Sequence, residues 1–294
     1  MDGIFNFNKP VGMTSHDVVA IIRKQLKQKR VGHAGTLDPL ACGVLPVCVG
    51  QATRVAEYLS ESGKAYQANI KFGTATDTYD AEGTITATAS TADLSLDMIK
   101  EALEQFLGPQ TQYPPLYSAI KIQGQPAYKR ARAGESIVLE PRPIFIYALE
   151  ILEWIPPRLT VAIECSKGTY IRSLAHDLGT HTGCYGYLET LVRTRSGPFT
   201  LSDSITLEQF AEAVETDAIQ HYCFPLDKAL EQYPAIKIDT ETEERVKHGN
   251  TFNCAVANNA GIARVYSSNG AFIAIAEWNE EQQGWNPKKV FASD

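Results

Sequence analysis

The chain contains 294 residues, of which 44% are hydrophobic and 21% are charged, a composition ordinary for a globular protein and a length that allows one large domain or two unequal ones. Its first residues lack the basic and apolar segments of a secretory signal, and no apolar run approaches the roughly 20 residues of a membrane span. The six cysteines are scattered without a Cys-x-x-Cys pair, which argues against a disulfide framework or a zinc site and indicates reduced thiols in the cytoplasm.

The net charge of −7 is unevenly distributed along the chain. Residues 1–200 are nearly neutral, with 20 basic and 19 acidic side chains, whereas residues 201–294 carry 7 basic and 15 acidic ones. Nucleic-acid binding requires a local basic surface rather than a basic total. The composition therefore leaves a polyanionic partner open.

The first predicted element is a helix over 15–29. Thr14 and Asp17 fit a capping pattern, and apolar residues recur at four-residue spacing from Val18 onward. The opposite side is basic, which is typical of a solvated helix face when such a run stands alone.

Glycine and proline predict a loop over 32–46, and strict alternation predicts a strand over 66–72. A helix over 96–107 is expected to end at Gly108-Pro109. The other expected elements are strands over 144–154, 159–165 and 187–193 and helices over 169–182 and 206–215. Residues 223–235 read as a linker that leads to a small all-β region over 236–294.

The predicted loop contains one carboxylate, Asp38, in an apolar setting. Gly32, Gly35 and Gly43 allow positive φ and close approach of a partner, and Pro39 stiffens the backbone after Asp38. An aspartate held in this way suits a nucleophile, because such a group needs fixed geometry and exclusion of water. An ordinary Asx-turn, in which Asp38 bonds its own backbone, explains the same spacing.

A second segment, CSKGTYIRSLAHDLG over 165–179, places Tyr170 and Arg172 at the start of a predicted helix. A buried arginine there would keep a nearby aspartate ionised, although a surface ion pair is the commoner case. Tyr66 opens the predicted strand on its apolar face and suits either a core position or stacking on a base. His33 lies in the glycine-rich loop, and its position alone assigns it no role.

Basic and aromatic residues interleave over 113–142, a mixture that suits RNA loops because phosphates need cations and splayed bases need flat partners. The candidates for contact with an RNA backbone are Lys121, Lys129, Arg130, Arg132 and, further along, Arg193. Individually these residues are weak signals.

Together these segments resemble the TruB family of tRNA pseudouridine synthases. The match runs in order through NKPVGMTS, VGHAGTLDPLACGVLPVCVGQATR, KAYQANIKFGTATDTYDAEG, PPLYSAIKIQGQPAYKRARAGE, CSKGTYIRSLAHDLG and LVRTRSGPF. Six motifs in register over about 200 residues are far more specific than any single short pattern. The C-terminal residues resemble a PUA-type appendage much more weakly.

The resemblance implies an α+β fold, in which a mixed, largely antiparallel sheet is flanked by helices and followed by a small all-β PUA-like domain. Residues 1–225 would form the catalytic domain, with 113–142 as a mobile thumb, and 236–294 would form the appendage. The chain would act as a monomer in the cytoplasm on the uridine at position 55 of tRNA, in the T loop.

The resemblance also assigns roles to individual residues. Asp38 would be the catalytic aspartate, paired with Arg172, and Tyr66 would stack on the target base. The substrate-binding residues would be His33, which helps to turn the base out, together with Tyr170, Leu191, Lys9 and Asp80. The isomerisation involves no net redox change or hydrolysis, so the resemblance implies no metal and no nucleotide cofactor.

Two other interpretations remain at this stage. A non-catalytic RNA-binding or tRNA-folding protein on the same scaffold would show the same basic clusters, but would not need Asp38 and Arg172 together. A glycosidase-like enzyme would ordinarily use two catalytic carboxylates, and the loop offers only one.

Overall fold

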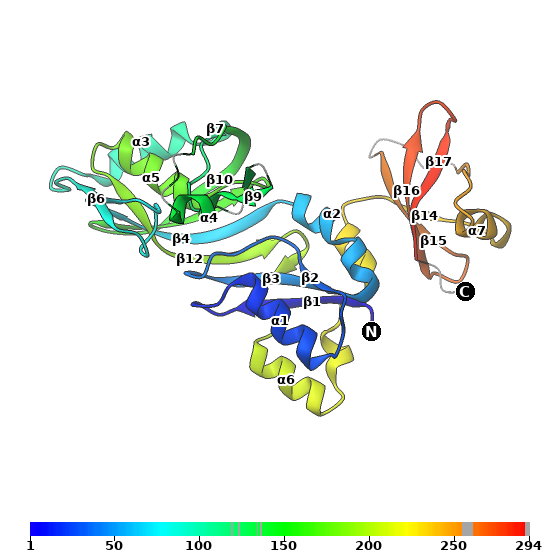
Figure 1. The fold of residues 1–294 in the computed structure, drawn as a ribbon. Helices are drawn as coiled ribbons and strands as arrows, with labels where there is room; N and C mark the ends of the chain where they lie inside the picture. The colour runs from blue at the N-terminus through cyan, green and yellow to red at the C-terminus, as the bar shows by residue number, and fades with distance from the viewer. Residues whose placement is uncertain (119, 123, 134, 136, 255–260, 292–294) are drawn as a thin grey trace.

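The computed structural model describes residues 1–118, 120–122, 124–133, 135, 137–254 and 261–291. A large mixed sheet with helices on both of its faces forms most of the molecule, and a separate, β-rich C-terminal region follows it (Figure 1). No helix in these ranges is both long and apolar enough to cross a bilayer.

Nine strands of the described chain form the large sheet, in the order β1-β3-β12-β4-β11-β10-β7, with β2 on β3 and β13 on β12. Their bounds are β1 (Gly3–Lys9), β2 (Val31–His33), β3 (Ala41–Val49), β4 (Lys64–Phe72), β7 (Gly108–Gln112), β10 (Arg142–Ile155), β11 (Arg158–Cys165), β12 (Gly186–Ser196) and β13 (Phe199–Thr200). The β3–β12 pair is parallel and the other ladders described in this sheet are antiparallel. The predicted mixed, largely antiparallel sheet is confirmed.

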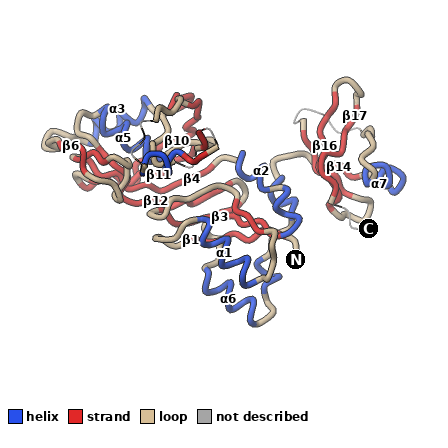
Figure 2. The backbone as a smooth tube through the Cα atoms, in the orientation of Figure 1, coloured by secondary structure: helices blue, strands red, loops and turns tan. Residues whose placement is uncertain are grey.

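The helices cover opposite faces at the two ends of this sheet (Figure 2). Apart from α4, which is described below, the helices that precede the C-terminal region are α1 (Ser15–Gln25), α2 (Ala56–Glu61), α3 (Leu96–Gln105), α5 (Ile171–His181) and α6 (Leu207–Glu215). Three short 3-10 helices accompany them, η1 (Gly50–Arg54), η2 (Ile219–Tyr222) and η3 (Leu226–Leu230). Helices α1 and α6 pack on β1–β3, and α3 and α5 pack on the β4–β11–β10 end. Capping boxes start α1 at Thr14 and α6 at Thr206, as the sequence predicts.

Five strands of the large sheet, β1, β2, β3, β7 and β13, are not among those expected from the sequence, and the loop expected over 32–46 is wrong in part. Residues 41–46 belong to β3, and only the turn between β2 and β3 is loop. The reason is that β3 is buried on both faces: Leu45 and Val47 pack toward α1 and α6, while Val44 and Cys48 pack toward α2. Its apolar run therefore shows no alternation, and Gly43 and Pro46 read as loop signals.

The segment over 113–142 contains β8 (Lys121–Ile122), β9 (Gln125–Pro126) and α4 (Ala127–Arg132). A small hairpin of β5 (Thr74–Thr76) and β6 (Ile85–Thr88) precedes it. Both excursions leave the sheet at the end where α5 packs. They therefore flank the start of α5.

The C-terminal region is β-rich, as expected. Its described strands, β14 (Ala235–Lys237), β15 (Ile262–Tyr266), β16 (Phe272–Asn279) and β17 (Gly284–Val290), form one sheet, accompanied by a short helix, α7 (Thr240–Lys247), that the sequence analysis does not predict. The residues expected to be a linker are largely structured, because η3 buries Ala229 and Leu230 in a core shared with β1 and β3.

The C-terminal region contacts α2 and η1 through hydrogen bonds, an ion pair and apolar packing. The guanidinium of Arg54 donates a 2.7 Å hydrogen bond to the Val290 carbonyl and lies over the Phe291 ring. The ammonium of Lys289 pairs with Glu57. Ile275 of β16 joins the same apolar core as β1 and β3. Charge and apolar contacts thus act together at this junction.

The parallel β3–β12 pairing places Gly43 opposite Arg193. Gly43 has φ +101°, and a Cβ there would lie 2.3 Å from the Arg193 carbonyl oxygen. We expect Gly43→Ala to lower the free energy of unfolding by about 2–4 kcal/mol, because strain and a backbone clash combine. Gly183→Ala is the matched control, since Gly183 also has positive φ but nothing within 4 Å of the added Cβ. Its free energy of unfolding should fall by only about 1 kcal/mol. If urea unfolding gave the same fall in the free energy of unfolding for Gly43→Ala and Gly183→Ala, this explanation would be contradicted.

Burial raises the pKa of Asp177, on α5, to about 6. A raised carboxyl pKa means that the folded protein binds the proton more tightly than the unfolded chain. Stability is therefore lost as the pH rises from about 4 through 6. We expect Asp177→Asn to be more stable than the wild type by about 1 kcal/mol at pH 7.5, allowing for partial exposure, and equal to it at pH 4. Urea unfolding at both pH values measures this, with Asp97→Asn on the exposed end of α3 as the control.

Candidate active site

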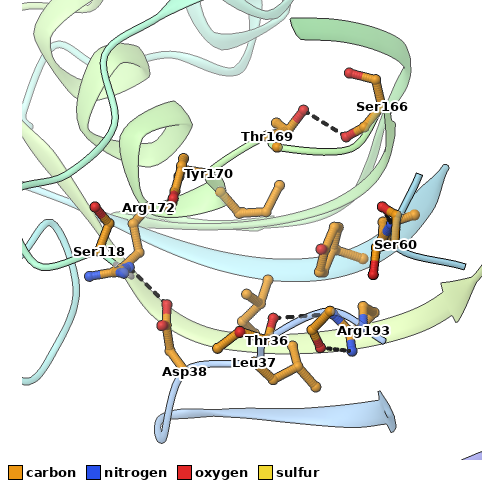
Figure 3. A pocket seen from close by; sticks show the side chains of 16 residues that line it. Thr36, Leu37, Asp38, Ser60, Ser118, Ser166, Thr169, Tyr170, Arg172 and Arg193 are labelled. Carbon is orange, nitrogen blue, oxygen red and sulfur yellow. Dashed lines mark hydrogen bonds and ion pairs between the residues drawn. The ribbon is translucent and has the colours of Figure 1, made fainter. Parts of the chain in front are cut away.

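A cavity of about 250 Å³ opens beside the junction of β3, β12 and β4. Its wall includes Asp38, Tyr66, Tyr170, Arg172, Leu191 and Arg193 (Figure 3). These residues come from the β2–β3 loop, β4, the start of α5 and β12, so the fold brings together segments that are far apart in the sequence. Five of the six were expected to form one site, and Arg193 was expected elsewhere.

Arg172 connects two carboxylates. Its Nε lies 2.9 Å from Asp38 Oδ2, and its Nη1 lies 3.4 Å from Asp80 Oδ2. The guanidinium also donates to the Thr78 carbonyl through Nη1 at 3.4 Å and to the Tyr117 carbonyl through Nη2 at 3.0 Å. Only 6% of the Arg172 side chain is exposed, so the surface ion pair considered from the sequence does not describe it.

Asp38 is the carboxylate of this network that faces the cavity. Its side chain is 36% exposed, whereas that of Asp80 is 4% exposed. Desolvation raises the pKa of Asp38, and the Arg172 guanidinium opposes this rise. Desolvation disfavours the charged form of the carboxylate while the guanidinium stabilises and orients it, so the site holds an oriented carboxylate oxygen against an open space.

The turn that carries Asp38 is fixed by α1. The Ser15 hydroxyl accepts a 2.8 Å hydrogen bond from the Leu37 amide and donates a 3.2 Å bond to the Leu37 carbonyl. The Ala41 amide donates to the Asp38 carbonyl at 3.1 Å, which closes the turn before β3. Gly35 has positive φ, as expected, whereas Gly32 is an ordinary residue of β2. The backbone of the turn is thus bonded independently of the Asp38 carboxylate.

Tyr66 and Leu191 line the cavity from adjacent strands, β4 and β12. Leu191 is buried, and Tyr66 packs against the core around α5. Burial raises the pKa of the Tyr66 hydroxyl, and the nearby Arg193 guanidinium opposes the rise. The phenol is therefore neutral at physiological pH, and its ring borders the open space.

Tyr170 is the N-terminal cap of α5 and is held by a residue that the sequence analysis misses. The side-chain amide of Gln112 accepts from the Tyr170 amide at 2.8 Å and donates to the Tyr170 carbonyl at 3.0 Å. Gln112 is buried at the end of β7. A buried glutamine must be fully hydrogen-bonded, but no local sequence pattern marks it.

Lys9 and His33 lie near the cavity without lining it. Lys9 is fully buried, and its ammonium donates to the carbonyls of Pro10 and Met13 at 2.9 and 2.6 Å. Burial lowers the pKa values of both Lys9 and His33. His33 ends β2 and is half-buried. Both residues border the Asp38 turn, Lys9 from β1 and His33 from the preceding strand.

The candidates for contact with an RNA backbone separate into three groups. Lys129 is exposed, and Arg130 pairs with Glu135 at 2.6 Å. The side chains of Lys121 and Arg132 lie outside the described part of the structure. Arg193 is only 1% exposed and donates to backbone carbonyls, so the expectation of a surface phosphate contact is wrong there. Alternation on a strand, rather than charge, would have identified it as an inward-facing residue.

Comparisons with known proteins agree with this geometry. Residues 23–171 match the TruB family pseudouridylate synthase N-terminal domain, and residues 172–231 match the tRNA pseudouridylate synthase B C-terminal domain. A Dehalococcoides mccartyi protein named tRNA pseudouridine synthase B is 43% identical over 293 residues, which cover 100% of this chain and 97% of the relative. A protein of the same name from Symbiobacterium thermophilum is 46% identical over 252 residues, covering 85% and 82% of the two chains.

Solved structures agree as well. A chain of a Cbf5-Nop10-Gar1 complex aligns with a TM-score of 0.79 and 28% identity, covering 99% of this chain and 85% of that one. A chain of an H/ACA RNP bound to a substrate RNA containing 2′-deoxyuridine aligns with a TM-score of 0.76 and 26% identity, with coverage of 99% and 85%. The sequence motifs, the sheet and these similarities agree, and the chain belongs to the TruB family of pseudouridine synthases, which are isomerases.

Proposed function

We propose that this protein converts a flipped-out uridine in the T loop of tRNA, at position 55, to pseudouridine by means of the Asp38 carboxylate and without a cofactor. The observation that carries the proposal is the 2.9 Å ion pair between Asp38 and the buried Arg172 at the wall of the cavity. Family membership and relatives named tRNA pseudouridine synthase B support the reaction class and the RNA.

The reaction breaks the N1–C1′ bond, turns the uracil and forms a C5–C1′ bond, with no net change in atoms. The Asp38 carboxylate acts at the electron-poor carbon, either by attacking or stabilising C1′ or by adding to C6. Arg172 keeps Asp38 ionised and aimed. A closed pocket protects the sugar intermediate from water.

The target base must leave the RNA stack, which costs a few kcal/mol. Tyr66 offers its ring as a stacking partner, and Leu191 and Tyr170 complete the apolar wall. Because the Tyr66 phenol stays protonated, its hydroxyl can also donate or accept a hydrogen bond at the base. Three residues support the site without contacting the reacting atoms: Lys9, His33 and Asp80. Of these, His33 helps to turn the target base out of the RNA stack.

The segment over 113–142 serves as the thumb that closes on the RNA, and it is rooted beside the catalytic pair. The main-chain carbonyl of Tyr113 accepts a 2.8 Å hydrogen bond from the Ser173 hydroxyl, and that of Tyr117 accepts one from the Arg172 guanidinium. Lys121, Lys129, Arg130 and Arg132 provide its phosphate contacts. We assign catalysis to residues 1–225 and further RNA contacts to 236–294, in a monomer acting on tRNA in the cytoplasm.

Asp38→Asn should bind a T-stem-loop RNA with a Kd within about threefold of the wild type while its single-turnover rate falls more than about 1,000-fold. The amide keeps the shape of the side chain but removes the negative charge and the nucleophile. Pseudouridine mapping and filter binding measure the two effects. Asp93→Asn, an exposed aspartate outside the cavity, is the matched control and should retain both activities.

Undiminished pseudouridine formation by Asp38→Asn would refute the mechanism. An anticodon stem-loop of equal length tests the substrate, because equal modification of both hairpins by the wild type would refute the T-loop assignment. If the wild type binds the T-stem-loop and modifies no uridine, the alternative of a non-catalytic RNA-binding protein replaces the proposal.

The pH dependence of the single-turnover rate tests the pairing of Asp38. The reactive form is the carboxylate, so the rate rises with pH until Asp38 is ionised, and the pKa of Asp38 lies above its ordinary value of 3.8 because of desolvation. Since Arg172 lowers this pKa and Asp80 raises it, Arg172→Gln should move the acid limb to higher pH by about 1 unit or more, and Asp80→Asn should move it to lower pH. Shifts in the same direction for both variants would contradict the assignment.

A further inference from the structure

Arg193 is a buried cation that the reaction as described does not use. It projects from β12 into the wall of the cavity, two residues after Leu191, and is 1% exposed. Its Nε donates to the Val44 carbonyl at 2.7 Å. Its Nη2 donates to the Gly35 carbonyl at 3.1 Å and its Nη1 to the Thr36 carbonyl at 3.3 Å (Figure 3). Within the described chain no carboxylate lies in ion-pair reach of it.

These three carbonyls flank the catalytic carboxylate on both sides in sequence. Gly35 and Thr36 precede Asp38, and Val44 follows it in β3. One rigid guanidinium therefore ties together the two stems of the turn that presents Asp38. Burying a charge is unfavourable unless its hydrogen bonds are satisfied, and the forked guanidinium suits several fixed acceptors where a lysine ammonium does not.

The same guanidinium reaches the second key group of the cavity. Tyr66 stands opposite Arg193 in the β4–β12 ladder and lines the same cavity, and the Arg193 guanidinium opposes the rise in the pKa of the Tyr66 hydroxyl that burial causes. Gly43 lets β12 approach β3 closely enough for this arrangement, because a Cβ there would meet the Arg193 backbone. Arg193 is therefore bonded to both stems of the Asp38 turn and lies beside Tyr66 on the neighbouring strand.

We propose that Arg193 is a positioning residue for the isomerisation, whose buried guanidinium fixes the Asp38 turn and the Tyr66 ring relative to each other. The inference rests on the proposed function and adds a residue to it. It differs from an RNA contact, because it predicts a loss in the chemical step with little loss in RNA affinity. It differs from a simple core residue, because the loss should be coupled to Tyr66 and reversible by a small guanidinium.

Arg193→Ala and Arg193→Lys are compared with the wild type on a T-stem-loop RNA, by single-turnover rate at saturating enzyme, Kd and thermal unfolding. We expect the rate to fall about 100-fold in Arg193→Ala, as for a misplaced reacting group, and less in Arg193→Lys, with Kd within about threefold in both. Millimolar guanidinium should restore part of the rate of Arg193→Ala, whereas urea, which has a similar shape but no charge, should not. Arg195→Ala is the matched control, since Arg195 is on the same strand and pairs with Glu164 outside the cavity.

A double-mutant cycle with Tyr66→Phe completes the test. If Arg193 acts partly through the phenol, the loss in rate of Arg193→Lys and Tyr66→Phe together is smaller than the product of the separate losses. Wild-type rates in both Arg193 variants, a loss confined to Kd, or independent losses without guanidinium rescue would each overturn the inference. If Arg193→Ala fails to fold, Arg193→Lys and the cycle decide alone. A wild type that modifies no uridine would instead refute the proposed function.

Discussion

The site depends on one buried guanidinium shared between two carboxylates. Arg172 has Asp38 on one side and Asp80 on the other, and only Asp38 faces the cavity. Asp80 accepts from the Thr78 hydroxyl and the Glu82 amide, so it is immobile. In the cavity wall, the Asp38 carboxylate stands among the cationic side chains of Lys64, Arg172 and Arg193. Its orientation toward the open space follows from the Arg172–Asp80 arrangement rather than from any single residue.

The position of the cavity follows from the large sheet, whose two ends are covered by different helices on different faces. At the β1–β3 end both faces are covered, by α1 and α6 on one side and by α2 and η3 on the other. At the β4–β11–β10 end α3 and α5 cover one face. The cavity lies where these two arrangements meet, so its wall combines a loop, two strands and a helix start. Bulges in the β4–β12 ladder at this point show that regular pairing is interrupted there.

Much of the fold could be predicted from local patterns. Helices with capping boxes, such as α1 and α6, and the alternating strand β4 are readable because each has one buried and one exposed side. Strand β3 was not, because burial on both faces erases alternation. The proximity of Asp38 and Arg172 came only from the resemblance, since the spacing alone favoured an ordinary Asx-turn at Asp38. Strand alternation could have shown that Arg193 faces inward, but the hydrogen-bonding roles of Gln112 and Arg193 could not be recognised, because their partners are backbone atoms 58 to 158 positions away.

The junction of the C-terminal region with the rest of the chain has its own consequence. Arg54 and Lys289 hold β17 against α2, and Ile275 completes an apolar core that begins at β1. The end of α2 runs through Ser62 and Gly63 directly into β4, the strand that carries Tyr66. The C-terminal region is thus in direct contact with α2 and with the apolar core beneath it. A chain ending at residue 231 would uncover apolar surface beside the very strand that supports the aromatic ring of the cavity.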